Sequence, residues 1–560
     1  KTCGDADFLV DVSASSGLGV TFDWSGQCTV SNSKVHITGA GSCRVTASQL
    51  GDGNYEAAAS VERSFQIAKA PTVTVVSSAP NPSGAGQLVT LTATVTSAAG
   101  VPTGTVTFRD GGNVLACSNA GGQALGVGGA ATCTTTALGA GGHALTAEYS
   151  GDANFLAGTG SLSGVQTVGG AFEFAQAVYA VAERGGSVAV TVRRTGDASQ
   201  AASVDYSTDD GGAPSVAVAC SATTGLALER CDYTRAAGTL QFAANETQKT
   251  FVVLVNDDSY VEGTETTQLR LSNPSAGAVL GARPAAALEI ADDASEPAAN
   301  VIDDDEAFVR QHYHDFLNRE PDADGLKFWT DGIKACGDDA GCREVKRVHT
   351  SAAFFLSIEF QETGYFAYRV HKAAFGDLAS DKPVPVVLRD FLRDTQRLGQ
   401  GVVVGQGAWR QQLDENRRAF ASEFVRRPEF LAQHQSGMSA AEFVNRLDAD
   451  AGGVLSELEK AALVAELTPN PSDATLRADV LRQVADNAAL VVREKNRAFV
   501  LMQYIGYLRR DPSDAPEQNL DFAGYNFWLG KLEQFGGDFV GAEMVKAFIN
   551  STEYRSRFGR

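Results

Sequence analysis

Hydrophobic and polar residues alternate through most of the first half of the chain. In 89–96, valine, leucine and alanine alternate with threonine, and Val188, Val190 and Val192 repeat the same spacing. A period of two places alternate side chains on one face of a strand. Glycine- and aspartate-rich turns separate these runs. The pattern therefore predicts a series of half-buried β-strands.

The period becomes helical after residue 305. Phe308, Tyr313, Phe316 and Leu317 fall on one stripe of a predicted helix. The spacing of the strands that come before is typical of β-sandwiches. We therefore expect a multidomain fold in which three all-β Ig-like sandwiches are followed by an all-α helical repeat domain.

Recurring segments indicate repeats within both parts of the chain. The segments 51–55 and 151–155 each follow a predicted strand, and their spacing matches the length of an Ig-like domain, about 100 residues. The helical part repeats three kinds of segment, and we expect its aromatic residues to form the core. These segments are 318–322 with 509–512, 328–329 with 527–528, and 357–360 with 427–430 and 551–554.

These patterns divide the chain into five parts. A short polar stretch with a proline after residue 293 indicates a linker. The acidic run 303–305 suits the start of a helix, because the helix N-terminus attracts negative charge. The predicted parts are 1–69, 71–168, 170–293, the linker 294–304, and 305–560 with two related halves at about 305–435 and 436–560.

Acidic residues collect at the strand ends of the third β domain. Ca²⁺ takes six to eight oxygen ligands, mostly from carboxylates and carbonyls. A strand end can gather several carboxylates without burying them. Asp-Gly and Asp-Asp pairs also form turns without any ion. Spacing alone therefore leaves both interpretations open.

The stretch 172–293 resembles a Calx-beta domain. Members of the sodium–calcium exchanger type bind Ca²⁺ at one end of this sandwich, so the resemblance implies calcium as a cofactor. The matching landmarks are Glu183, 208–211, 231–233, 238–240, 246–249, 256–258, 262–265, 271–273 and 290–293. Carried over residue by residue, the implied calcium ligands are Glu183, Asp210, Asp232, Asp292 and Asp293.

Two departures from the exchanger type reduce the number of ions that we expect. Thr234, Arg235, Ala236 and Ala237 stand where that type has acids, and 213–230 is an insertion. Five carboxylates can still hold one ion. The positive charge of Arg235 would oppose a cluster of several ions.

The flanking parts resemble modules of secreted bacterial proteins. Both N-terminal modules resemble bacterial Ig-like repeats, and the opening strand of the first would precede Lys1. The C-terminal part resembles a helical family of unknown function that is distantly similar to phycobilisome linker domains. The segments that carry these resemblances are 14–18 and 39–41, 102–108 and 149–152, and 308–313 with 318–322. They imply an architecture rather than a task.

The acidic composition restricts the partners of the chain. Its 46 lysines and arginines stand against 67 aspartates and glutamates, which gives a formal charge of −21. Nucleic-acid binding needs basic patches, so we expect no nucleic-acid partner. No apolar run reaches the roughly 18 residues of a membrane helix, so we expect no membrane span.

Eight of the nine cysteines form four local pairs, one in each predicted module. Zinc sites would favour closer Cys-x-x-Cys pairs or histidine partners. Local pairs in successive modules favour disulfides formed in an oxidising compartment, so we expect an extracellular or cell-surface protein. The predicted disulfides are Cys28–Cys43, Cys117–Cys133, Cys220–Cys231 and Cys336–Cys342, which leaves Cys3 over.

The sequence contains no recognisable catalytic motif. His312 and His314 are two residues apart and share no helix face, so we expect them and His349 at the surface or at helix caps. The segment 322–325 lacks the bidentate glutamate of a calcium loop, which favours a turn or a helix cap. We therefore expect no enzyme, but a structural or interaction protein.

Two functions fit this expectation. The first is a self-assembling filament or surface-layer subunit, stabilised by calcium, which polymerises or binds other surface proteins. The alternative is a cell-surface adhesin that binds a host or a glycan through its Ig-like modules.

Overall fold

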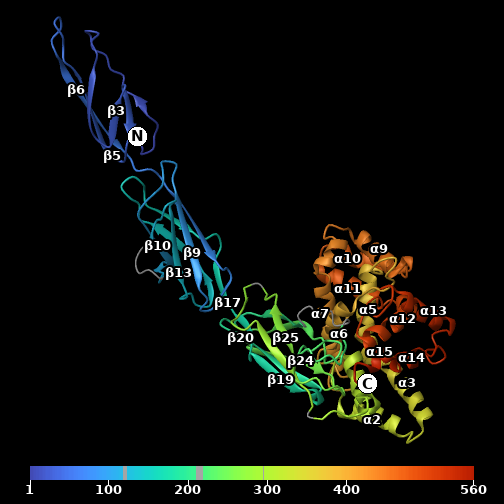
Figure 1. The fold of residues 1–560 in the computed structure, drawn as a ribbon. Helices are drawn as coiled ribbons and strands as arrows, with labels where there is room; N and C mark the ends of the chain where they lie inside the picture. The colour runs from blue at the N-terminus through green and yellow to red at the C-terminus, as the bar shows by residue number, and fades with distance from the viewer. Residues whose placement is uncertain (118–122, 210–217, 276, 294, 560) are drawn as a thin grey trace.

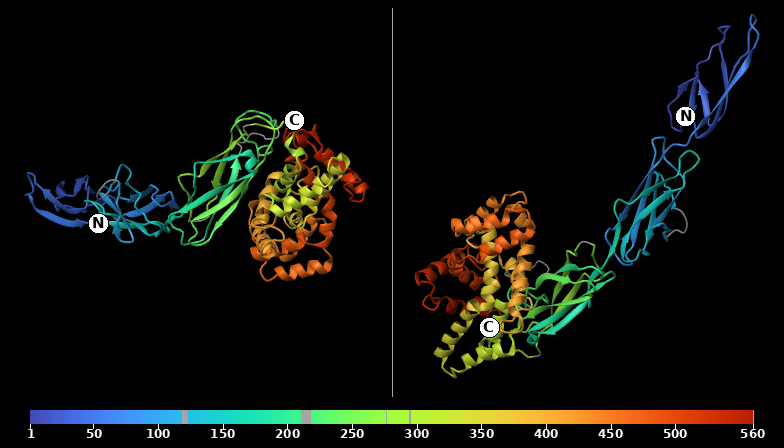
Figure 2. Two further views of the ribbon diagram at one scale, coloured as in Figure 1. Left: turned by 90° about the horizontal axis from the view of Figure 1, so that it is seen from below. Right: turned by 180° about the vertical axis from the view of Figure 1, so that it is seen from behind.

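The computed structural model describes residues 1–117, 123–209, 218–275, 277–293 and 295–559. β-Sandwiches follow one another from the N-terminus in an extended row, and a helical region forms the opposite end (Figures 1 and 2). This order confirms the predicted fold class. Among the described residues, no helix is long and apolar enough to cross a bilayer.

The first module contains two antiparallel three-stranded sheets. Its strands are β1 (Phe8–Leu9), β2 (Thr21–Gly26), β3 (Cys28–Ser31), β4 (Lys34–Ile37), β5 (Gly41–Gln49) and β6 (Ala58–Ile67). The sheets have the orders β1-β4-β3 and β2-β5-β6. Val30, Val35 and Val45 are buried in the small core of this module. In the second sheet, Trp24 of β2 and Val61 of β6 are 46% and 52% exposed.

The second module confirms the alternation predicted for 89–96. Its strands are β7 (Val73–Ala79), β8 (Ser83–Gly84), β9 (Val89–Thr96), β10 (Thr105–Asp110), β11 (Asn113–Val114), β12 (Gln123–Ala124), β13 (Ala130–Thr135), β14 (Gly141–His143), β15 (Leu145–Tyr149), β16 (Gly158–Ser161) and β17 (Gln166–Gly169). The main sheets are β11-β10-β15-β16, β13-β9-β7 and β14-β17-β8. Every second residue of β9 is buried in the core.

The repeated segments 51–55 and 151–155 form the same turn. Asp52 accepts hydrogen bonds from the backbone N–H groups two and three residues further on, at 2.8 and 3.0 Å. Asp152 accepts the equivalent bonds at 2.8 and 2.9 Å. In the second module this turn also joins the modules, because Asn154 Oδ1 accepts a bond of 2.9 Å from the backbone N–H of Ala40.

The third module is a sandwich of two five-stranded sheets. Its elements are β18 (Ala171–Phe174), β19 (Val178–Ala182), the 3₁₀ helix η1 (Glu183–Gly185), β20 (Ser187–Thr195), β21 (Ala202–Asp209), β22 (Tyr233–Thr234), β23 (Ala237–Phe242), β24 (Gln248–Val255), β25 (Glu265–Ser272), β26 (Val279–Leu280) and β27 (Ala285–Ala291). The sheets have the orders β22-β24-β20-β18-β26 and β19-β27-β25-β21-β23. Val190 and Val192 are buried between them, as the sequence predicts.

The helical region contains 3₁₀, α and π helices. They are η3 (Val301–Asp303), α1 (Asp305–His312), η4 (Tyr313–Leu317), α2 (Ala323–Lys334), α3 (Ala340–Leu356), α4 (Ile358–Glu362), α5 (Gly364–Phe375), α6 (Leu388–Gly399), α7 (Trp409–Phe424), α8 (Pro428–Gln433), α9 (Ala440–Ala451), α10 (Glu457–Leu467), α11 (Ala474–Ala485), α12 (Ala488–Met502), η5 (Gln503–Leu508), α13 (Ala523–Gln534), α14 (Met544–Ile549) and α15 (Thr552–Arg555). The helices η4 and η5 are π-helical.

Two hydrophobic cores hold these helices together. One core joins the two ends of the region, because Phe308 and Phe354 pack in the same cluster as Tyr507 and Phe548. The other lies among the middle helices, from α5 to α12. The packing therefore does not divide at the predicted boundary near residue 435.

Acidic side chains start several of these helices, as the sequence predicts. Asp304 caps α1 by accepting bonds from the N–H groups of Glu306 and Ala307. Asp322 caps α2 by accepting a bond of 2.9 Å from the N–H of Gly325. A side-chain oxygen at this position satisfies backbone donors that have no partner inside the helix.

The prediction for two histidines is wrong. His312 and His314 are fully buried rather than at the surface. The imidazole of His312 bonds the Phe308 carbonyl and the Ser351 hydroxyl, both at 2.7 Å, and that of His314 lies 3.0 Å from a Glu320 carboxylate oxygen. All six residues from 311 to 316 are buried, so this segment has no solvent-facing side.

The structure contains the four predicted disulfides, each within one module. They are Cys28–Cys43, Cys117–Cys133, Cys220–Cys231 and Cys336–Cys342, with sequence separations of 15, 16, 11 and 6 residues. Cys3 is a free thiol that packs against the cores of the first two modules.

Candidate metal centre

The strand register of the third module brings acidic residues to one end of the sandwich. β19 runs parallel to β27, and Ala182 is the register partner of Ala291. The residues that follow these two, Glu183 and Asp292, therefore leave the sheet side by side. On the other sheet Tyr233 pairs with Val255, which places Asp232 next to the loop after β24.

This loop adds further carboxylates. Asp257, Asp258 and Glu262 lie between β24 and β25, and Glu265 is the first residue of β25. The segment predicted as a linker contributes Glu296, so part of that segment belongs to the site. Further along it, Ile302 is buried in the helical core.

The carboxylates form three overlapping triads. In each triad, one oxygen from every residue lies within 4.8 Å of the others, a spacing that a single cation can bridge. The triads are Glu183–Asp258–Glu262, Glu183–Asp292–Glu296 and Asp232–Glu262–Glu265. Every candidate ligand atom in the triads is a carboxylate oxygen, and hard cations such as Ca²⁺ prefer oxygen ligands of this type.

Several of these carboxylate oxygens are buried and accept no hydrogen bond from the described residues. Among the described residues, no hydrogen bond reaches Glu183 Oε2, Asp232 Oδ1, Glu262 Oε2, Asp292 Oδ1 or either carboxylate oxygen of Glu296. Buried polar atoms in folded proteins normally have a partner, and a bound ion is one explanation when the protein supplies none. The carboxylate oxygens of the triads, several of which accept no hydrogen bond, therefore fit a bound cation.

Burial and mutual repulsion raise the pKa values of the cluster. Burial, with the neighbouring carboxylates, raises the pKa of Glu183 to about 9 and that of Glu262 to about 8. Burial also raises the pKa of Asp258 to about 7 and that of Glu296 to about 7. The pKa of Asp232 is raised by burial and by Glu265 beside it. A bound cation would offset this cost by stabilising the ionised forms.

The structure brings together three of the five predicted ligands. Glu183, Asp232 and Asp292 are members of the triads. Asp293 lies at the margin and forms an ion pair with Arg184. Asp210 lies outside the described residues.

Five acids of the cluster were not predicted as ligands. The segments 256–258 and 262–265, which carry most of them, were landmarks of the family resemblance, so the signal was present in the sequence. Arg235, which was expected to oppose several ions, instead pairs with Glu229 at 3.1 Å. The missed residues are Asp257, Asp258, Glu262, Glu265 and Glu296.

The loop that carries Asp258 and Glu262 also contacts the helical region. The hydroxyl of Tyr260 donates a hydrogen bond of 3.1 Å to the carbonyl of Ser556. The side-chain amide of Gln311 donates one of 3.2 Å to the amide oxygen of Asn256. The candidate site therefore lies at the junction of the third sandwich and the helices.

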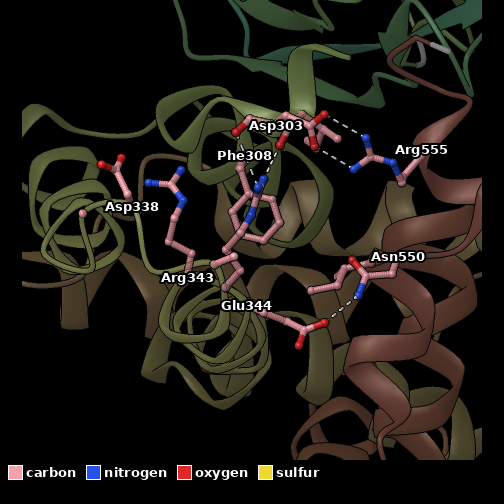
Figure 3. A pocket seen from close by; sticks show the side chains of 12 residues that line it. Asp303, Phe308, Asp338, Arg343, Glu344, Asn550 and Arg555 are labelled. Atoms are coloured by element: carbon pink, nitrogen blue, oxygen red, sulfur yellow. Dashed lines mark hydrogen bonds and ion pairs between the residues drawn. The ribbon is translucent and has the colours of Figure 1, made fainter. Parts of the chain in front are cut away.

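A pocket, separate from the carboxylate cluster, lies within the helical region between η3, α3 and α14 (Figure 3). It measures about 470 Å³ and is lined by charged side chains. Asp303 forms two bonds with Arg555, at 2.8 and 2.9 Å, and Arg343 bonds buried Asp305 at 2.7 Å. These charges are paired within the fold, so the pocket is best explained as part of the helix packing.

Two family models match the β part of the chain. Residues 76–169 match the bacterial Ig-like domain (group 3), and residues 166–294 match the Calx-beta domain. The protein therefore contains these two domains, followed by a helical region that neither model reaches. The resemblance of the helical region to a known family stays a prediction.

This chain is similar to two further proteins, and in each case the match covers only a small part of the relative. The extracellular matrix organizing protein FRAS1 of Homo sapiens is 39% identical over 119 residues, which are 21% of this chain and 3% of FRAS1. The sodium/calcium exchanger 1 of Canis lupus familiaris is 29% identical over 187 residues, which are 32% of this chain and 16% of the exchanger. The chain therefore spans a small part of these relatives.

Solved structures are similar to single stretches of the chain. The crystal structure of the apo-form Calx CBD1 domain is 33% identical and covers 22% of this chain and 97% of its own, with a TM-score of 0.19. A tetra-tandem repeat from the extending region of a large adhesion protein is 16% identical and covers 49% of this chain and 66% of its own, also with a TM-score of 0.19.

Proposed function

We propose that this protein is a non-enzymatic extracellular structural or interaction protein whose Calx-beta domain binds calcium. The observation that carries the calcium binding is the set of buried carboxylate oxygens that have no donor among the described residues. Calx-beta domains bind calcium, and the sodium/calcium exchanger similar to this chain is named for that ion. The residues that would hold the ion are Glu183, Asp232, Asp258, Glu262, Glu265, Asp292 and Glu296.

The extracellular location is supported by the covalent structure. Each of the four modules carries one disulfide, and such bonds persist in oxidising compartments. The two matched domain types add to this support.

Calcium titration of the full chain tests the proposal. An ion that binds only the folded state stabilises it by about 2.7 kcal/mol at a hundredfold excess over Kd, so we expect a higher Tm with calcium than with chelator. Asp292→Asn should weaken this shift, whereas Glu289→Gln, a carboxylate of β27 outside the triads, should leave it unchanged. An equal Tm in calcium and chelator would refute calcium binding.

The structural role that we propose is that of a filament or surface-layer subunit. The sandwiches form an extended row with a helical region at one end, a shape suited to end-to-end contacts (Figure 1). The long strand β6 lies at a sheet edge, and such edges can pair with a strand of another chain. The partners would be further copies or other surface proteins. A strict monomer in sedimentation at high concentration with calcium would contradict this role.

A second candidate function is adhesion through the first module. This module carries Trp24, Leu50 and Tyr55, which are 46%, 82% and 53% exposed. Exposed aromatic side chains are frequent anchors in binding surfaces. Cell- or glycan-binding assays with Trp24→Ala and Tyr55→Ala test this function, and binding that both variants retain would exclude this surface as the adhesive one.

A further inference from the structure

One arginine lies at the margin of the carboxylate cluster. Arg184 follows Glu183 in η1, and its guanidinium forms an ion pair with Asp293. The same guanidinium lies 3.9 Å from Asp257 Oδ1. Asp257 and Asp293, called here the outer pair, therefore already share a positive charge supplied by the chain.

The other acids of the cluster are not paired with a positively charged side chain in the part of the chain that the structure describes. Among the described residues, none of them forms an ion pair with a lysine, arginine or histidine. Four of them are more than nine-tenths buried, and two of these four, Glu183 and Asp232, each have an oxygen without a hydrogen-bond donor. These seven acids, called here the inner carboxylates, are Glu183, Asp232, Asp258, Glu262, Glu265, Asp292 and Glu296.

The causes of the pKa shifts also differ between the outer pair and the inner carboxylates. Burial raises the pKa of Asp257 to about 6, while Arg184 and Arg310 of α1 both act to lower it. For Glu183 and Glu262, burial is the largest cause of the raised pKa, and the neighbouring carboxylates raise it further. Arg310 lines a cavity of about 250 Å³ together with Arg184, Asp257 and Glu183, so the two groups of acids meet at this cavity.

A calcium ion at the outer pair would meet two obstacles. It would need the carboxylate oxygens that the guanidinium now engages, and it would bring a second positive charge close to the first. The inner carboxylates present neither obstacle.

We infer that Arg184 acts as a built-in cation that occupies the outer pair, so that calcium binds only among the inner carboxylates. Loss of the arginine side chain opens a further calcium position at Asp257 and Asp293. This inference rests on the calcium binding proposed above and adds what limits the number of ions.

The number of calcium ions bound by the full chain tests the inference. Isothermal titration calorimetry and native mass spectrometry give the stoichiometry of the unmodified chain, of Arg184→Ala and of Arg193→Ala. Arg193 is an exposed arginine of β20, so its removal is the control for the loss of one positive charge. We expect one additional calcium ion per chain in Arg184→Ala and the unmodified number in Arg193→Ala.

Two further variants separate the charge of Arg184 from other effects. Arg184→Lys keeps a positive charge and should keep the unmodified stoichiometry. Arg184→Ala combined with Asp293→Asn should lose the additional ion again, because the outer pair is then incomplete. Equal stoichiometry in Arg184→Ala and the unmodified chain would overturn the inference while leaving calcium binding in place. An unmodified chain that binds no calcium would instead overturn the proposed function.

Discussion

At the scale of single residues, the cluster of carboxylates makes the calcium-free protein sensitive to pH. A carboxyl group whose folded pKa is raised contributes stability that is complete below its unfolded pKa, about 4, and is lost as pH rises through the folded value. For Asp258, Glu262 and Glu183 these folded values are about 7, 8 and 9.

The first prediction follows from this sign. In chelator, the Tm of the full chain should fall as the pH rises from 5 to 9, and calcium should restore it most strongly at the high end. Differential scanning calorimetry at several pH values measures both curves. Glu183→Gln should flatten the chelator curve, since it removes one of the titrating groups. A Tm that rises with pH in chelator would contradict the assignment.

A buried ion pair in the helical region gives a second prediction. Asp394 is fully buried and accepts two bonds from Arg427, at 2.7 and 2.9 Å, one of 2.7 Å from His371 and one of 3.0 Å from Arg393. These partners hold the pKa of Asp394 well below its usual range, although burial acts to raise it. Removal of one partner from a buried pair costs about 3–5 kcal/mol, because the other charge stays buried and uncompensated.

We therefore expect Asp394→Asn to lower the free energy of unfolding by about 3 kcal/mol in denaturant titrations. The control is Asp331→Asn in α2, where an exposed pair with Lys327 is worth at most about 1 kcal/mol. Equal effects of the two substitutions would show that burial does not set the strength of the Asp394 contacts.

The sequence predicted the acids that directly follow paired strands better than those in loops. Glu183 and Asp292 directly follow strands that lie side by side, so their positions depend only on strand register. Asp258 and Glu262 lie in a loop, where the backbone path decides which acid points inward. Glu296 was missed because it comes after the sandwich, and its place depends on how the helical region docks.

At the scale of elements, the recurring segments of the helical part correspond to one structural device. In the first repeat, Arg319 bonds both carboxylate oxygens of Glu359, at 2.7 and 2.9 Å. In the second, Arg510 bonds Glu553 at 2.7 and 3.2 Å. Each arginine comes directly after a residue with positive φ that ends a π-helix, and each glutamate lies in a short helix.

The sequence predicted this repetition but not its chemistry. The segment 427–430, which recurs with 357–360 and 551–554, does not form the same contact. In the structure only Phe430 keeps its place in a core, while Arg427 turns to Asp394 and Glu423. The two residues of the repeated Phe-Trp dipeptide lie in different environments. Phe328 and Phe527 are 68% and 61% exposed, whereas Trp329 and Trp528 pack against the core.

The third prediction concerns this device. Glu359→Gln removes the charge that Arg319 engages in two bonds, and charge-assisted bonds of this kind contribute about 1.5–3 kcal/mol. We expect a loss of about 2 kcal/mol in the free energy of unfolding. Glu344→Gln is the control, because the pair of Glu344 with Lys546 is exposed on both sides. A loss no greater than that of the control would show that the repeated pair is not stabilising.

At the scale of the whole molecule, the C-terminal segment holds the third sandwich and the helices together. Arg557 is fully buried and pairs with buried Asp315 at 3.1 Å. It also donates a bond of 3.0 Å to the carbonyl of Arg230, next to the Cys220–Cys231 disulfide. The order of domains could be predicted from sequence periodicity, but this junction could not. It joins residues that are more than 300 positions apart, and no local pattern encodes such a contact.

The last prediction is that Arg557→Ala loosens this junction. The substitution leaves Asp315 without its main partner and frees the Arg230 carbonyl, so hydrogen exchange should become faster at 228–234 and 256–262 in the full chain. The second of these segments carries Asp258 and Glu262, and we therefore expect calcium to slow its exchange less in the variant than in the unmodified protein. Arg555→Ala is the matched control, because Arg555 is partly exposed and pairs with Asp303 inside the helical region. Unchanged exchange at both segments would show that the sandwich and the helices are held together without Arg557.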